Sequence, residues 1–432
     1  MKYQMLAVLS FAAFAAFSMP SVPQSSIQLV QDESSRRVDI TFTLENEPAV
    51  ITVDIQTNAG ASAWASIGGQ GQVTMFGDVN KLVAEPGEGK RITWFPRQDW
   101  PYLAPDKIRA EIKAWSVNDP PDWMVVSLVV TNMVRYYTSL DYAPEREPTN
   151  VTYFIDKLLM RKVKAAYVTW RAGSPLYDVS VGAYAARAFP YKVMLTNDYY
   201  LGVHPVTRGQ DRIASLGGNG YGWNSTSDPI DNDYTYGRMF VGMLATYNNL
   251  RGTSDDSWKG WPQCGHELKS SSAWLNNFRA ITGLEIDLPT AAEWEYACRA
   301  GTTTAVYNGT DLLSIAGATE NLADIAWCQY TRDTAPYVVS GRTQVSLLKP
   351  NAWGFYDMLG NFMEWCLNWY QNNTSSDLQV DPRGPESSAI GKRVIRGGWL
   401  NNSYQFCTAG VWYEGAPTEN HTFRLRAPCI AK

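Results

Sequence analysis

The feature that most constrains the fold of this chain is a change of residue pattern near residue 118. From residue 26 onward, apolar and polar residues alternate with the period of two that is typical of β-strands, as in RRVDITFTL, AVITVDIQ and KIRAEIKAW. Turns rich in Gly and Pro separate these runs. Roughly seven short strands at such spacing predict an antiparallel β-sandwich for residues 19–118.

The rest of the chain has another composition. Residues 119–150 are Pro-rich and polar at both ends and predict a linker, whereas residues 151–432 are rich in Gly, Asn, Trp and Tyr and have few periodic segments. Two helices are indicated there. One covers Ser271–Thr282 and stops at Gly283, and the other begins at a capping box in LPTAAEWEYACRAG and ends before Gly301. An α+β domain with little regular structure needs many side-chain hydrogen bonds, disulfides or bound ions.

The first residues predict export. Lys2 is followed by an apolar run to Phe17, and small residues before Met19 suit a cleavage site, so residues 1–18 are interpreted as a signal peptide. A buried N-terminal helix is the alternative. The next apolar segment, Trp123–Val134, is too short and too polar to cross a bilayer and is read as a strand. We therefore expect a secreted or periplasmic protein without a membrane span.

Charge and histidine content exclude several classes of function. The net charge of −5 gives no basic footprint for nucleic acid. The three histidines are widely spaced and no CxxC occurs, which argues against a zinc site or a Ser-His-Asp triad. The oligomeric state is not indicated by the sequence.

All six cysteines lie in the last two fifths of the chain. In an exported protein they are expected to form disulfides, but six thiols allow 15 full pairings and the sequence does not choose among them. The six are Cys264, Cys298, Cys328, Cys366, Cys407 and Cys429.

The segment PNAWGFYDMLGNFMEWC suggests a cation site. Asp357, Asn361 and Glu364 surround Gly360, which permits a tight turn. Carboxylates together with turn carbonyls suit a hard cation such as Ca²⁺. The equally weighted alternative is that these side chains cap the turn themselves.

The segment RGGWLNNSYQFC holds a cysteine among amides and aromatic residues. Cys407 could be a nucleophile, half of a disulfide or half of a metal site. Polar and aromatic side chains in an irregular loop favour ligand contact over residues 399–422, and the alternative is a loop that packs its own aromatic rings. The candidate ligand-binding residues are Trp399, Asn401, Asn402, Tyr404, Phe406, Trp412 and Tyr413.

Several motifs in one order resemble a known family. LPTAAEWEYACRAGTTT, PNAWGFYDMLGNFMEWC, DPRGP, RVIRGGW and FRLR are similar to the sulfatase-modifying factor family, which includes the formylglycine-generating enzyme. The resemblance covers about residues 150–432 and implies a C-type lectin-like α+β fold. The N-terminal sandwich resembles immunoglobulin or fibronectin-like modules, with no diagnostic residue.

The resemblance also implies site residues. It implies a structural Ca²⁺ held by Asp357, Gly360, Phe362 and Glu364. Enzymes of the family hold Cu(I) with two thiolates, four and nine residues after the second Gly of the GG motif. In this chain these positions are Asn402 and Cys407, so copper is not expected, because a carboxamide is a poor ligand for soft Cu(I).

Cys407 therefore has two implied roles. It is the catalytic candidate only if the chain is an enzyme. Relatives that carry a cysteine in this loop imply instead a Cys298–Cys407 disulfide.

These observations leave several functions open. The favoured one is an exported module that binds a protein or glycan ligand through residues 399–422, without enzymatic activity. The alternatives are a copper-dependent oxidase that converts a sulfatase cysteine to formylglycine, a lectin-fold binding protein diversified by a retroelement, and a structural envelope component.

Overall fold

The computed structural model describes most of the chain, and it forms two compact units. Residues 1–67 and 74–116 cluster in the first unit, and residues 68–73 and 117–432 in the second. The predicted signal peptide lies outside the described residues. The description covers residues 19–428 except 59–62, 69–73, 102–106, 175–188, 215–241, 254–267, 269, 272, 312–319, 335–337, 340–341 and 372–374.

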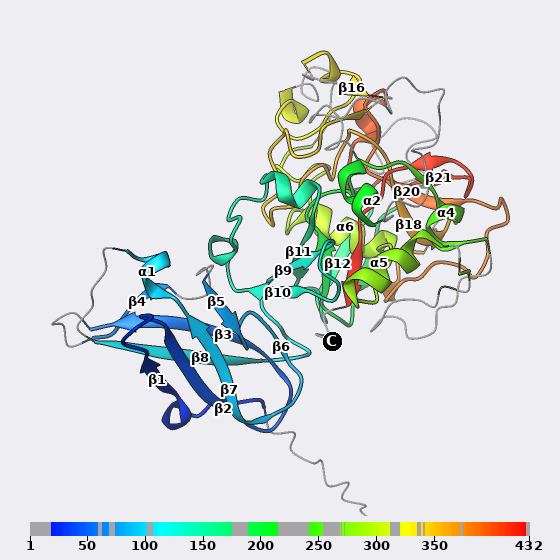
Figure 1. Cartoon of the computed structure of the whole chain (residues 1–432). Helices are drawn as coiled ribbons and strands as arrows, with labels where there is room; N and C mark the ends of the chain where they lie inside the picture. Colours follow the sequence, from blue (N-terminus) through cyan, green and yellow to red (C-terminus); the bar gives the residue numbers. More distant parts are fainter. Residues whose placement is uncertain are drawn as a thin grey trace, which may run out of the picture. The chain divides into compact units, whose positions relative to one another are not determined.

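The first unit consists of two antiparallel sheets that face one another (Figure 1). In one sheet the order is β1 (Gln28–Gln31), β2 (Val38–Leu44), β7 (Gly87–Trp94) and β5 (Met75–Gly77). In the other, β3 (Ala49–Thr57) pairs with β4 (Ala65–Gly68), β6 (Lys81–Val83) and β8 (Ile108–Ser116). Short helices are also present: η1 (Gln24–Ser26) and α1 (Pro96–Asp99).

The alternating sequence explains this sandwich. Along β2 every second residue is buried, and these side chains pack against apolar residues of β3 in one core. Because side chains of a strand point alternately to its two faces, only this register hides the apolar set. The predicted all-β N-terminal region is confirmed.

The second unit contains small sheets joined by long connections (Figure 1). One antiparallel sheet has the order β10 (Val134–Tyr137), β9 (Trp123–Ser127), β11 (Lys157–Val163), β14 (Tyr199–Gly202) and β23 (Arg426–Pro428). A second has β12 (Thr169–Ala172), β13 (Tyr191–Met194) and β19 (Leu378–Val380), and a third has β18 (Glu364–Trp369), β20 (Arg393–Arg396) and β21 (Tyr413–Gly415). Two-stranded ladders join β15 (Ala245–Thr246) to β22 (Asn420–His421), and β16 (Val338–Val339) to β17 (Arg342–Thr343).

The segment predicted as a linker is part of this unit. β9 and β10 form a hairpin, and β9 continues the sheet by pairing with β11. Met124, Val125 and Val126 are buried there. The Pro-rich flanks of the segment suggested a boundary, but the apolar strand between them is covered within the second unit.

Both predicted helices are present. α5 (Trp274–Thr282) starts three residues later than expected and ends at Gly283, which adopts the left-handed conformation. α6 (Ala291–Arg299) begins with the predicted capping box, in which Thr290 and Glu293 exchange hydrogen bonds. In the described part of the chain, no helix is long and apolar enough to span a membrane. The other helices are α2 (Arg208–Ala214), α4 (Tyr247–Arg251), η2 (Leu140–Tyr142), η3 (Val151–Phe154), η5 (Arg332–Thr334) and η6 (Tyr404–Phe406).

Buried ion pairs connect the irregular segments. Arg424 donates from Nε to both carboxylate oxygens of Glu364, at 3.0 and 2.9 Å, and from Nη1 to the carbonyl of Val203 at 2.9 Å. Arg396 pairs with Glu295 of α6 and donates to the carbonyl of Val411. Guanidinium groups thus satisfy backbone carbonyls that no sheet pairs.

Candidate functional site

The Gly397–Gly398 pair fixes the start of the C-terminal loop. Both residues have positive φ, +92° and +85°. A Cβ on Gly398 would lie 2.7 Å from Sγ of Cys407 and 2.8 Å from the carbonyl oxygen of Phe406. Only glycine therefore permits the loop to return so closely over Cys407.

Cys407 lies beside Cys328. Both side chains are fully buried. Interaction between the two thiols lowers the pKa of Cys328 to about 6 and raises the pKa of Cys407 well above its usual range. The sequence pattern predicted no role for Cys328 beyond its place among the six cysteines.

The Cys298–Cys407 disulfide is absent from the structure. Cys298, Cys328, Cys366 and Cys407 are all free thiols, and the thiol that Cys407 contacts is Cys328. Burial raises the pKa of the Cys298 thiol, which lies inside α6. Cys264 and Cys429 lie outside the described residues.

Asn402 occupies the position where the resemblance implied a thiolate. Its backbone carbonyl accepts from the amide of Gln329 at 3.0 Å, and its buried Oδ1 has no hydrogen-bond partner among the described residues. The hydrogen bond from Gln329 thus holds the segment at residue 329 against the loop. The side-chain carboxamide of Asn402 gives no soft ligand for a metal.

The loop predicted to contact ligand mostly packs its own rings. Tyr404, Trp412 and Tyr413 are 9%, 5% and 5% exposed. Phe406 stacks on Tyr413 with centroids 5.0 Å apart, and Trp399 is half-buried. The side chain of the exposed Asn401 accepts from Arg332. The seven candidate residues are therefore not gathered on one exposed surface, because the aromatic rings fill the core.

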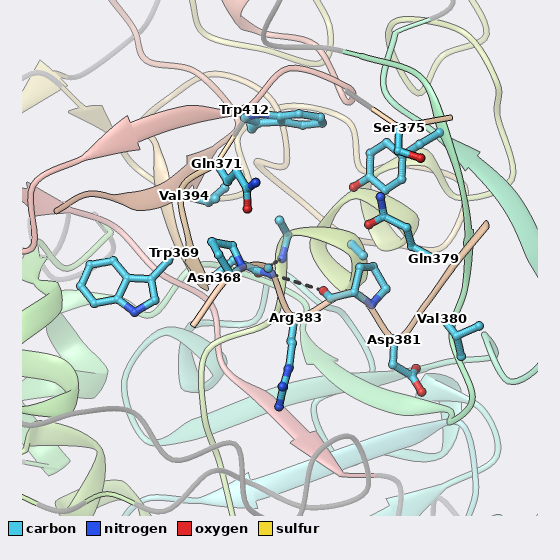
Figure 2. Close-up of a pocket in the computed structure, with 16 residues that line it drawn as sticks. Asn368, Trp369, Gln371, Ser375, Gln379, Val380, Asp381, Arg383, Val394 and Trp412 are labelled. Atoms are coloured by element: carbon cyan, nitrogen blue, oxygen red, sulfur yellow. Dashed lines mark hydrogen bonds between the residues drawn. The ribbon is translucent and has the colours of Figure 1, made fainter. Parts of the chain in front are cut away.

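A pocket lies beside the C-terminal loop, and Trp412 of the loop lines it (Figure 2). Its volume is about 770 Å³, within the range of small-molecule sites. Figure 2 shows the Trp412 ring at one end and Asp381 and Arg383 at the other. The lining comes from β13, the start of α6, β18, β19, β20 and the segments beside them, and it includes Tyr191, Ala291, Ala292, Asn368, Trp369, Gln371, Ser375, Gln379, Val380, Asp381, Pro382, Arg383, Gly384, Pro385, Val394 and Trp412.

Hydrogen bonds hold the pocket walls. Asp381 accepts from the amide and hydroxyl of Thr196, at 2.8 and 2.6 Å. Asn368 accepts from the amide of Ala291 at the start of α6 and donates to the carbonyl of Pro382. The walls are therefore positioned without a ligand.

One polar atom of Trp412 has no hydrogen-bond partner in the described structure. This atom is the indole Nε1, which is buried. The Tyr191 ring meets it edge to face, with centroids 6.0 Å apart. A buried N–H without a partner is uncommon and indicates an unfilled contact.

The predicted calcium ligands are only partly arranged around one space. A cavity of about 10 Å³ borders Asp357, Asn361 and Phe362, and Asp357 accepts from the amide of Ser346 at 2.7 Å. Burial raises the pKa of Asp357 and of Glu364. Glu364 does not line the cavity and has its charge balanced by the guanidinium described above.

The predicted turn around Gly360 is present and uses positive φ. Asp357, Gly360 and Asn361 have positive φ, and a Cβ on Gly360 would lie 2.3 Å from the Trp327 carbonyl oxygen. Asn361 exchanges hydrogen bonds with the backbone of Thr343. No cluster of three or more His, Cys, Asp or Glu that could hold a metal ion is found among the described residues.

Comparison with known proteins decides the family. Residues 161–425, more than half of the chain, match the sulfatase-modifying factor enzyme 1-like domain. The chain belongs to the sulfatase-modifying factor family.

Members of this family with curated descriptions match the chain over part of their length. The formylglycine-generating enzyme of Thermomonospora curvata is 34% identical over 125 residues, which cover 28% of this chain and 40% of that enzyme. The Bos taurus formylglycine-generating enzyme is 34% identical over 121 residues, or 28% of this chain and 31% of the enzyme. The chain thus spans less than half of either enzyme.

Longer matches are more distant. The chaperone protein LppX of Paenibacillus barcinonensis is 26% identical over 260 residues, 55% of this chain and 81% of that protein. Among solved structures, Treponema denticola variable protein 1 covers 63% of this chain and 95% of its own, with 21% identity and a TM-score of 0.43.

Within this family member, sequence reasoning missed the pocket. The signal that could have found it was the DPRGP motif, because residues 381–385 supply one wall. That motif entered only as evidence of resemblance. Trp412 is the single residue shared by the predicted binding loop and the pocket lining.

Proposed function

We propose that this protein is a glycan-binding member of the sulfatase-modifying factor family and that the pocket bordered by Trp412 is its binding site. The observation that carries the proposal is a preformed pocket whose lining includes Trp412, a residue whose buried indole Nε1 has no hydrogen-bond partner within the described structure. A ligand acceptor that reached this nitrogen would satisfy it.

The pocket lining suits a sugar. Trp369, which is half-buried, offers a ring surface for the C–H face of a sugar, and the largely buried rings of Trp412 and Tyr191 border the same pocket. Gln371 and Gln379 offer donors and acceptors for hydroxyl groups. Asp381 and Arg383 carry opposite charges, so the lining shows no strong preference for a charged ligand. A neutral ligand with many hydroxyls meets both requirements.

The same geometry disfavours the oxidase reading. Asn402 stands where the family's enzymes have a thiolate, and the Cys407 thiol is buried with a raised pKa. Reactivity requires an accessible thiolate. The activity of the partially matching relatives is therefore not the preferred function of this chain.

Binding to a glycan array, followed by titration calorimetry on the hits, tests the proposal. Trp412→Phe keeps a ring and removes the N–H, so it should weaken binding roughly 2- to 10-fold, the effect of one hydrogen bond. Gln371→Ala, at an exposed pocket position, should also weaken it. Asn401→Ala is the matched control in the same C-terminal region, outside the pocket lining.

Two results would overturn the proposal. One is full affinity in both pocket variants. The other is loss of affinity in Asn401→Ala alone, which would move the site to the exposed part of the loop.

A second candidate is the copper-dependent oxidase. One observation favours it: Cys328 places a second sulfur beside Cys407, so two thiols are present although Asn402 is not one of them. If they held Cu(I), the metal would supply O₂ chemistry toward a substrate cysteine. Titration with Cu(I), combined with an oxidation assay on a peptide that carries the sulfatase cysteine motif, tests it. Tight binding with turnover would favour the enzyme.

We also propose a structural Ca²⁺ held by Asp357 and the carbonyl of Phe362. The residues Asp357 and Phe362 both line the small cavity, and carboxylate and carbonyl oxygens are the ligands that Ca²⁺ prefers. Glu364 would have to share its oxygens with Arg424. Calcium should raise the melting temperature of the wild type and not of Asp357→Asn. Equal melting temperatures with Ca²⁺ and with a chelator would exclude the site.

Export remains part of the proposal. It is supported by the apolar leader at residues 1–18. Finding the protein uncleaved in a cytosolic fraction would contradict it.

A further inference from the structure

The core of the second unit contains two buried cysteines, Cys328 and Cys407, that have no role in the proposed glycan site. Cys328 and Cys407 are both fully buried and belong to the same hydrophobic cluster, and the residues that follow Cys328 contact the segment that precedes Cys407. Each residue already has its backbone fixed. The amide of Cys328 donates to Oγ1 of Thr331 at 2.9 Å, and the amide of Cys407 donates to the carbonyl of Tyr404 at 3.0 Å.

The segments around the two sulfurs are held together independently of the thiols. The amide of Gln329 donates to the carbonyl of Asn402 at 3.0 Å. The rings of Tyr330 and Tyr404 lie 5.9 Å apart, centroid to centroid. The residues that follow Cys328 thus hold the segment that precedes Cys407.

We infer that Cys328 and Cys407 form a disulfide that joins the turn after residue 328 to the loop after Gly398. This inference is independent of the proposed glycan site. It assigns a partner to Cys407 that differs from Cys298, which lies inside α6, because the contacts with residues 402 and 404 come from the residues that follow Cys328.

A disulfide suits this environment better than the two other uses of a thiol pair. A nucleophile must be reached by its substrate, and both sulfurs are fully covered. A dithiolate metal site would place negative charge in the core, where an unpaired charge is costly. A disulfide is neutral and packs like an apolar group among Tyr404, Ala409 and Ala326.

A disulfide compound such as oxidised glutathione serves as the oxidant of the two cysteine thiols and is itself reduced to two thiols. The thiolate of one cysteine attacks the reagent's S–S bond, forms a mixed disulfide and releases one reagent thiol. The second cysteine loses its proton, and its sulfur attacks the first cysteine's sulfur and displaces the second reagent thiol. Two electrons pass from the cysteine pair to the reagent, and the protons end on the released thiols. Because both sulfurs are buried, local opening must precede exchange.

Peptide mapping of the full chain tests the inference. The protein is equilibrated in glutathione buffers of increasing oxidation, free thiols are trapped with iodoacetamide, and digestion is carried out without reductant. We expect a peptide pair that links Cys328 to Cys407 in oxidising buffer and separates on reduction. The Cys298→Ser variant should give the same link, which makes it the matched control.

Other outcomes contradict the inference. These are a link from Cys407 to any other cysteine, alkylation of both residues at every buffer composition, or a protected pair that retains one equivalent of a soft metal. All of these are read on the wild-type chain, so a variant that fails to fold does not obscure the result.

Discussion

Reduction of the Cys328–Cys407 bond should measurably destabilise the second unit. The bond would close a loop from residue 328 to residue 407, about 80 residues, and the chain-entropy model gives roughly 4–5 kcal/mol for such a loop. In a domain of this size, 1 kcal/mol changes the melting temperature by about 2–4 °C. Reductant should therefore lower the melting temperature of the second unit by roughly 10 °C.

Calorimetry of the oxidised chain with and without a phosphine reductant measures this difference. The double variant Cys328→Ala, Cys407→Ala should melt at one temperature in both buffers, whereas Cys298→Ser should keep the wild-type difference. The reasoning is refuted if the wild type shows no difference although mapping finds the bond. It is also refuted if the double variant still responds to reductant.

Three further variants test the interpretation of the second unit. Gly398→Ala should lower the free energy of unfolding by more than about 2 kcal/mol, because residue 398 has positive φ and its new methyl group would clash with Cys407. Gly391 also has positive φ but would place its methyl group with no atom within 4 Å, so Gly391→Ala should lower the free energy of unfolding by about half as much. Equal losses in urea unfolding would contradict the steric reading. Arg424→Met should cost about 3–5 kcal/mol, since it leaves a buried carboxylate unpaired, and a loss below 1 kcal/mol would contradict this. Burial, with Arg424 nearby, lowers the pKa of His204 from 6.5 to about 3. Between these pH values the unfolded chain binds a proton that the folded chain does not, so the free energy of unfolding decreases as the pH is lowered. His204→Gln should flatten that fall in acid titrations followed by circular dichroism, and an unchanged slope would assign it to other groups.

The local parts of the fold could be predicted from the sequence because local chemistry determines them. The capping box at Thr290, the stop at Gly283 and the alternation of β2 each depend on residues within one turn or one strand. The family resemblance added the overall fold. The segment 119–150 was misread because its Pro-rich ends outweighed the apolar strand between them.

The site was harder to predict because it depends on contacts between distant segments. The proposed pairing of Cys407 with Cys328 depends on contacts of residues 329 and 330 with residues 402 and 404, and no spacing rule connects residues that far apart. Aromatic residues in a loop are compatible both with burial and with ligand contact. In the structure Tyr404 and Tyr413 are buried, whereas Trp412 is buried and also borders the pocket.

The Arg424–Glu364 pair has a consequence for synthesis. Glu364 opens β18, but its countercharge is supplied 60 residues later, immediately before β23. β23 in turn adds to β14, which was made more than 200 residues earlier, since Leu201 pairs with Arg426. A nascent chain that ends before residue 424 would have a carboxylate without its cation and a sheet without its edge strand. The second unit can therefore fold only after translation of its last strand, and until then its apolar segments need protection from aggregation.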